Sequence, residues 1–213
     1  MKKIIITSLI ILVGLTSCNT DFLDQENLFE KDLNSFYQTP QDIEEAMSGV
    51  FNALYVGGVH SNEHVTANLL SDMMLAGGGP DDVSAKNADA FIDPNVDTYR
   101  DLWGQNYKGI YRANAIIEAV ENGDFSQHFD SPAEAEVFKT QTLGEAYFMR
   151  AFFFFRGAKF FGGLPLITAT DTDRYLPRST FSETFAQIAS DLKKSIELFP
   201  ATNQTAIPSS EYG

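Results

Sequence analysis

The stretch at residues 144–166, GEAYFMRAFFFFRGAKFFGGLPL, decides the fold predicted for this chain. Between residues 146 and 161 nearly every position around a helix is apolar, a pattern typical of a helix buried at the centre of a bundle. Three cationic residues interrupt the run and disfavour a membrane span: Arg150, Arg156 and Lys159. Because a buried guanidinium needs a partner, we expect Arg150 to pair with an acidic residue of a neighbouring helix, with Asp72 as the candidate.

Clear boundary signals enclose this helix. Residues 131–134, Ser-Pro-Ala-Glu, have the sequence of a capping box with proline at the first helical position. At the other end, the pair Gly162-Gly163 and then Pro165 stop the helix. The sequence therefore predicts one long helix from about residue 132 to residue 161.

A last helix follows a short extended segment at residues 163–170. Thr180 or Ser182 provides its N-cap, Glu183 lies in its first turn, and Pro200 ends it. Four apolar residues recur at helical spacing, and we expect them to face inward: Phe185, Ile188, Leu192 and Ile196.

Three further helices are predicted on the N-terminal side. The first is capped by Thr39 and ends near the glycines at 57–58. The second and third cover about residues 65–75 and 98–120, and an acidic loop at residues 77–97 separates them. No strand pattern is convincing, so the sequence predicts an all-α fold of antiparallel helix pairs with long loops.

The N-terminus has the order of features found in a bacterial lipoprotein signal. Two lysines precede an apolar run at residues 4–15, which is shorter than the roughly 20 residues of a membrane-spanning helix. Small residues then lead to Cys18, the expected site of lipid attachment after cleavage. We favour this reading over an ordinary secretory signal with a chance cysteine. The predicted organisation is a signal peptide at 1–17, a lipidated lead at 18–38 and a helical domain at 39–213.

Composition narrows the classes of function. The net charge of −14 opposes binding to nucleic acids, where affinity depends on cationic residues that neutralise phosphates. A single cysteine cannot form an intramolecular disulfide, which argues against a disulfide-stabilised scaffold. An aromatic content of 13% excludes a disordered tether. These observations leave an exported, acidic, folded domain.

Three motifs match known functional sites, and for each we favour a purely structural interpretation. Residues 60–64 spell the zinc motif H-x-x-E-H, but Ser61 resembles a helix cap, which places His60 outside the helix. The glycines at 77–79 follow a helix rather than a strand and lack the lysine of a phosphate-binding loop. The pair Asp81-Asp82 is read as solvated, with a calcium site as the alternative.

The sequence supports no catalytic group. Cys18 is committed to lipid, and His128 has no partner motif. We therefore predict that the chain is not an enzyme and holds no cofactor or metal. Trp103, the sole tryptophan, is the one weak candidate for a ligand contact, because exposed aromatic rings stack on sugars. Its place on the apolar face of a helix favours packing in the core.

Several blocks together resemble the SusD/RagB family of nutrient-uptake lipoproteins of the outer membrane. They run in family order along nearly the whole chain, and the most specific are residues 144–152 and 161–166. The other matching positions are the LTSC at 15–18 with DFLD at 21–24, Trp103 with Tyr107, Ile110 and residues 112–114, and Arg178 ahead of Ile188, Asp191-Leu192 and Phe199-Pro200.

The resemblance implies a TPR-like helical superhelix on the surface of a Gram-negative bacterium. It implies a partner, a SusC-like TonB-dependent transporter, and a ligand that is an oligosaccharide or another nutrient. Acidic residues soon after Cys18 fit surface export in such bacteria. Family members are more than twice as long, so we expect this chain to be an N-terminal portion, with most of the ligand groove lying beyond it.

We therefore predict that the chain is a nutrient-binding lipoprotein, anchored in the outer membrane and facing the exterior, that takes part in uptake. The residues that contact the ligand stay unknown at this point. A helical-repeat scaffold lipoprotein that binds no small molecule is the alternative. An enzyme such as a lipoprotein glycosidase ranks third.

Overall fold

The structure is a computed structural model that describes residues 36–55, 59–92, 97–173 and 175–199. The chain divides into two units, Met1–Phe36 and Tyr37–Gly213, and every helix described below lies in the second. Cys18 falls outside the described residues, so the signal peptide and the lipid site remain predictions.

The described chain is all-α, as predicted, and contains no strand over the residues just given. Its helices form TPR-like antiparallel pairs. In chain order they are α2 (Pro40–Asn52), α3 (Val59–Leu70), α4 (Val83–Asp89), α5 (Asp97–Asn122), the 3-10 helix η3 (Ser126–His128), α6 (Pro132–Phe161) and α7 (Phe181–Leu198).

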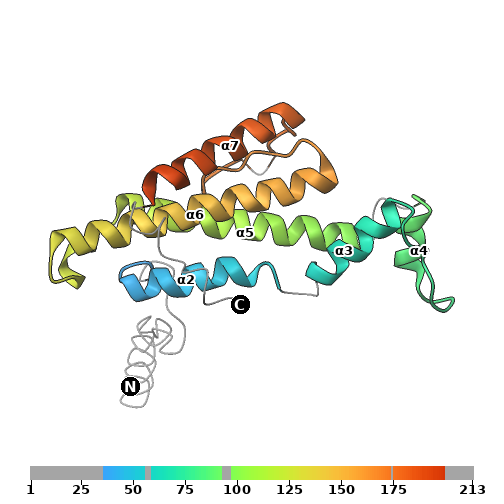
Figure 1. The fold of residues 1–213 in the computed structure, drawn as a ribbon, viewed down its shortest axis with the longest axis horizontal. Helices are drawn as coiled ribbons and strands as arrows, with labels where there is room; N and C mark the ends of the chain where they lie inside the picture. The colour runs from blue at the N-terminus through green and yellow to red at the C-terminus, as the bar shows by residue number, and fades with distance from the viewer. Residues whose placement is uncertain (1–35, 56–58, 93–96, 174, 200–213) are drawn as a thin grey trace, which may run out of the picture. The chain divides into compact units, whose positions relative to one another are not determined.

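Helix α6 lies at the centre of the packing. It runs antiparallel to α5 on one side and to α7 on the other, while α2 packs on α5 (Figure 1). α3 contacts α5 and α4. The largest fully buried side chains come mainly from α2, α5 and α6, and they include Ile43, Val50, Ile110, Ile116, Phe153 and Phe154. None of the described helices has both the length and the apolar content that crossing a membrane requires.

The predicted boundaries of α6 are confirmed. Ser131 is the N-cap, and its Oγ accepts a hydrogen bond from the backbone N–H of Glu134 at 3.3 Å. The capping box is only half formed, because the Glu134 carboxylate has no hydrogen-bond partner among the described residues. Gly162 ends the helix at a φ of 72°, a value that favours glycine.

A glycine allows α5 and α6 to approach closely. A Cβ atom added at Gly109 of α5 would lie 2.3 Å from the ring of Phe153 on α6, closer than atoms can pack. The Phe153 side chain is fully buried. The absence of a side chain at position 109 therefore makes room for the buried Phe153 ring.

The region between α2 and α5 differs from the prediction. α3 begins at Val59 and ends at Leu70, so His60 lies inside the helix and the expected range of 65–75 was wrong. The helix begins at Val59, directly after the glycines at 57–58 and before Ser61, which was the expected cap. It stops where Asp72 adopts a left-handed φ of 55°, which cannot continue a right-handed helix.

The expected loop at residues 77–97 also contains a helix, α4. Its N-cap residue, Asp82, makes no side-chain capping bond, so the usual sequence signal of a helix start is weak. The Lys86 ammonium donates to the Gly79 carbonyl at 2.7 Å and ties α4 to the preceding glycine turn. A short helix of this kind gives little periodicity to detect.

The inward face of α7 is only partly the predicted one. Thr180 caps the helix with Glu183 in a complete capping box, and Ile188 is buried, both as expected. Leu192 and Ile196 are instead 36% and 65% exposed. Polar residues take the inward positions, namely Thr184, Asp191 and Ser195.

Candidate functional site

The segment that joins α6 to α7, residues 162–180, forms a closed loop that we call the strap (Figure 1). Ser179 N–H donates to the Leu164 carbonyl at 3.0 Å, and Arg178 Nε donates to the Gly163 carbonyl at 2.9 Å. A Cβ atom at Gly163 would lie 1.9 Å from the Ser179 carbonyl oxygen. The two feet of the strap therefore meet at a point where only glycine fits.

Polar side chains of α5 hold the first half of the strap. Tyr107 Oη donates to the Pro165 carbonyl at 2.9 Å, and Asn114 Nδ2 donates to the Ile167 carbonyl at 3.0 Å. The backbone N–H of Thr170 donates to Glu118 Oε1 at 2.7 Å. These three α5 residues share one face of the helix, because their spacings of seven and four match helical turns. The strap is thus fixed along α5.

Arg150 lies at the meeting point of these elements. Its Nε and Nη2 donate to the two carboxylate oxygens of Asp191 on α7 at 2.8 and 2.7 Å. Its Nη1 donates to Asn114 Oδ1 at 2.9 Å and to the Thr168 carbonyl of the strap at 3.1 Å. A bidentate pair with further hydrogen bonds is the arrangement that makes a buried charge tolerable. One guanidinium therefore joins α5, α6, α7 and the strap.

The predicted pairing of Arg150 with an acidic residue on a neighbouring helix is confirmed, but the proposed partner was wrong. Asp72 lies beyond the end of α3 and is exposed. α6 packs along α7, and that packing brings Asp191 to Arg150.

A second polar bridge joins the same helices nearby. Tyr147 Oη donates to Glu121 Oε1 at 2.7 Å, and Lys194 Nζ donates to Tyr147 Oη at 3.1 Å. Burial, and then the bond to Glu121, raises the pKa of the Tyr147 phenol. The bond to Tyr147 in turn raises the pKa of Lys194. The phenol therefore stays protonated and bridges α5 to α7.

Trp103 lies at the edge of the core. Its ring centroid is 4.7 Å from that of Tyr107 and 5.2 Å from that of Phe161, in a tilted and an edge-on arrangement. The side chain is half-buried against the core. Its surroundings are those of a packed aromatic cluster beneath the strap.

The glutamate of the H-x-x-E-H motif at residues 60–64 forms ion pairs with α6. Glu63 on α3 accepts from Arg156 Nε at 2.5 Å and from Lys159 Nζ at 3.3 Å, both on α6. Over the described residues, no group of three or more His, Cys, Asp or Glu side chains gathers to hold a metal. The carboxylate of the motif thus docks α3 onto α6.

The glycines at 77–79 and the pair Asp81-Asp82 form a turn before α4. Asp82 N–H donates to the Gly79 carbonyl at 3.2 Å, and Gly78 has a φ of 86°. Both aspartates are exposed. A calcium site here remains the alternative prediction.

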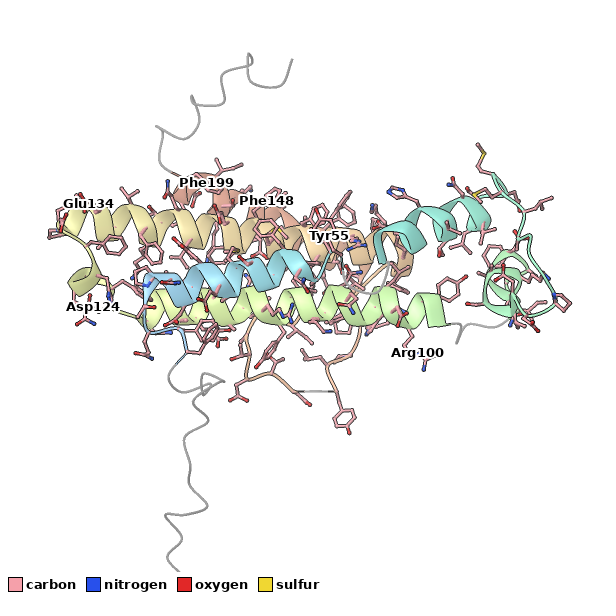
Figure 2. All side chains as sticks on the ribbon, turned by 90° about the horizontal axis from the view of Figure 1, so that it is seen from below. Tyr55, Arg100, Asp124, Glu134, Phe148 and Phe199 are labelled. Atoms are coloured by element: carbon pink, nitrogen blue, oxygen red, sulfur yellow. The ribbon has the colours of Figure 1, made fainter. Side chains whose placement is uncertain are left out.

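Two apolar surfaces were missed by the sequence analysis. The first, which we call the α6–α7 face, carries exposed Phe148, Phe152 and Phe155 on α6 and exposed Phe181, Leu192 and Ile196 on α7. Figure 2 labels Phe148 and Phe199 along this side, and a Cβ atom added at Gly144 would lie 3.3 Å from the Phe199 ring. The second surrounds the α3–α4 connection and exposes Met73, Leu75, Phe91 and Ile92. Exposed apolar side chains gathered on neighbouring segments are typical of interaction surfaces.

Glu145 lies three residues before Phe148 on α6 and is exposed at the surface, but partial burial of its carboxyl raises the pKa of that group. A raised pKa stabilises the folded state at low pH, and this contribution is lost as the pH rises through the folded-state value. Glu145→Gln is therefore expected to raise the melting temperature at pH 7, by roughly 1–2 °C because solvent screens the partly exposed group, and to leave it unchanged at pH 3.

Thermal denaturation followed by circular dichroism at both pH values tests this expectation. Glu136→Gln, at an exposed position of the same helix, is the matched control. An equal gain for Glu145→Gln at pH 3 and pH 7 contradicts the explanation by burial of charge.

Comparison with known proteins gives a consistent result. A family model described as starch-binding and associating with the outer membrane matches residues 21–210. Two proteins of Formosa agariphila named SusD-like are each 25% identical, over 99% and 98% of this chain. The chain spans only 39% and 41% of the length of these curated relatives.

Solved structures share the fold. A SusD superfamily protein of Bacteroides vulgatus superposes with a TM-score of 0.62 at 22% identity, covering 78% of this chain and 36% of that one. A laminarin-binding SusD-like protein superposes with a TM-score of 0.58 at 21% identity, again over 78% and 36%. At this identity the likeness establishes the architecture of the helices.

Proposed function

Because the chain belongs to the SusD-like family, whose model covers residues 21–210, we propose that it binds a glycan nutrient at the bacterial surface and delivers it to a TonB-dependent transporter. The match to a family described as starch-binding and associating with the outer membrane is the observation that carries this proposal. The fold shared with a laminarin-binding protein supports a glycan as the ligand. The role is binding rather than catalysis.

The proposal includes a longer protein, of which this chain is the N-terminal portion. The length of the curated relatives supports it, since the match covers only 39% and 41% of their length. The α6–α7 face supports it as well, because exposed phenylalanines on two adjacent helices suit further packing. Sequencing the coding DNA past the Gly213 codon tests this part directly.

Titration calorimetry with laminarin- and starch-derived oligosaccharides tests the binding role. Saturable binding to the chain, or to the product of its uninterrupted reading frame, is the expected result. Heats at the level of dilution for both proteins and both sugars contradict it.

A helical-repeat scaffold remains the second candidate, and the α6–α7 face is the observation that favours it. A scaffold co-purifies with a membrane complex after detergent extraction and binds no glycan. The proposed binder instead retains its saturable glycan binding when purified away from every partner. The two measurements together separate the candidates.

The proposed anchor is lipid attached to Cys18. Cys18→Ala is expected to move the protein from the membrane fraction to the soluble fraction and to abolish labelling by palmitate, because two or three acyl chains on one residue hold a protein firmly on a bilayer. Thr20→Ala, two residues away, is the control and keeps both properties. Continued lipid labelling of Cys18→Ala contradicts the assignment.

A further inference from the structure

A hollow of about 620 Å³ opens on the surface where the segment after η3 meets the first turns of α6. Figure 2 labels Glu134 at this end of α6. Glu134, Phe138 and Gln141 line the hollow from one face of the helix, at spacings of four and three residues. Phe129, from the segment before α6, also lines the hollow.

Two phenyl rings form a fixed apolar wall. The ring centroids of Phe129 and Phe138 are 5.3 Å apart, and that of Phe138 is 5.4 Å from Phe125 in an edge-on contact. Phe125 is buried in the core. The wall is therefore preorganised, because Phe138 is held between two other rings.

Three polar side chains line the same hollow: Ser131, Glu134 and Gln141. Ser131 Oγ accepts from the Glu134 backbone N–H, which leaves its own hydroxyl proton for another acceptor. The Glu134 carboxylate and the Gln141 amide line the hollow, and neither has a hydrogen-bond partner among the described residues. The half-formed capping box thus leaves a hydroxyl donor and a carboxylate acceptor, which lie with the Gln141 amide among the residues that line the hollow.

We propose that this hollow is a subsite for one neutral sugar residue of a glycan, an inference that rests on the proposed function. A pyranose ring has an apolar C–H face, which the Phe129 ring can stack against, and an edge of hydroxyl groups that need both donors and acceptors. Ser131, Glu134 and Gln141 supply both kinds. The open form of the hollow suits one unit of a longer chain that continues into solvent.

The charge of the residues at the hollow further limits the class of sugar. No lysine or arginine lines the hollow, Glu134 contributes a carboxylate, and the exposed Asp130 precedes Ser131. Uronate and sulfated sugars bring negative charge to this acidic surface and are repelled. The subsite therefore selects neutral hexoses.

Calorimetric titration of the purified chain tests the subsite with two probes, a laminarin-derived glucose oligosaccharide and an oligogalacturonate of the same length. Phe129→Ala is expected to weaken binding of the neutral probe by roughly three- to tenfold, the effect of one ring contact. Glu134→Gln is expected to raise the affinity for the oligogalacturonate, a change that a purely structural role does not produce. Phe148→Ala, an exposed phenylalanine elsewhere on α6, is the control.

The outcomes separate the two proposals. If the chain binds the neutral probe and Phe129→Ala binds it equally well, the subsite is refuted and the proposed function stands. If Phe148→Ala weakens binding as much as Phe129→Ala, the hollow is also refuted. If the chain and its longer reading-frame product bind no glycan at all, both proposals fall. The melting temperatures of all three variants report whether the fold is kept.

Discussion

Replacing Asp191 with asparagine is expected to lower the free energy of unfolding by about 3–5 kcal/mol, because it leaves the buried Arg150 guanidinium without its counter-charge. Both partners are almost fully buried, with side chains 6% and 1% exposed. Asp191 also accepts from Gln187 Nε2 at 3.0 Å, so the change disturbs a third residue. Urea denaturation followed by circular dichroism measures the loss.

A double variant distinguishes a missing charge partner from general damage. In Arg150→Met with Asp191→Leu, neither position leaves an unpaired buried charge, so the loss is expected to be smaller than the sum of the two single losses. Asp171→Asn in the exposed part of the strap is the control and changes stability by less than about 0.5 kcal/mol. A loss below about 1 kcal/mol for Asp191→Asn contradicts the central place given to this pair.

Gly109→Ala is expected to lower the free energy of unfolding by about 3 kcal/mol, the upper part of the range for an overpacked core. The new methyl group would lie 2.3 Å from the buried Phe153 ring, so α5 and α6 must move apart or the ring must leave its rotamer. Gly104→Ala on the same helix has no atom within 4 Å of its new methyl group. That control is expected to stabilise by up to about 1 kcal/mol, through helix propensity alone.

A second substitution that removes the clashing ring tests this steric explanation directly. Phe153→Leu removes the ring atoms that meet the new methyl group, so the pair Gly109→Ala with Phe153→Leu is expected to be more stable than additivity predicts. Denaturation curves of the two single variants and the pair give the coupling. If Gly109→Ala stabilises the protein as Gly104→Ala does, the close approach of α5 and α6 at this point is not real.

The part of the fold that sequence predicts well is the part decided by local chemistry. Ser131-Pro132 starts α6 and Gly162 ends it, because capping bonds and backbone preference act over a few residues. Thr39 and Thr180 cap α2 and α7 for the same reason. The apolar run before Gly162 likewise predicted the central helix, since a helix that is apolar on all sides is buried.

The wrong predictions concern features that depend on residues far apart in the sequence. The need of Arg150 for a partner is local, but the choice of Asp191 over Asp72 depends on which helix packs beside α6. The same pairing turns α7 so that Asp191 faces inward, which leaves Ile196 exposed against the expectation from periodicity. Periodicity alone assumes that apolar residues face the core, and a buried ion pair reverses that rule locally.

The candidate sugar subsite shows a different limit of sequence analysis. The capping-box sequence at residues 131–134 implied that Ser131 and Glu134 satisfy each other, and the fold satisfies only one of the two bonds. The hollow beside them is formed by Phe129, whose position depends on the turn before α6. A sequence signal did exist in the phenylalanines on both sides of this turn, but spacing alone does not show that their rings meet.

The strap divides the chain into two pieces that could be made separately. Its feet and first half are fixed by hydrogen bonds to α5 and α6, while Tyr175 at its tip is 90% exposed. A polypeptide that ends at the tip keeps α2 to α6, and a short peptide that begins there carries α7 with Asp191. Mixing the two pieces is expected to restore the contact between Arg150 and Asp191, which would make α7 the small half of a split-protein complementation pair. An affinity tag inserted at the same tip would extend into solvent without crossing the core.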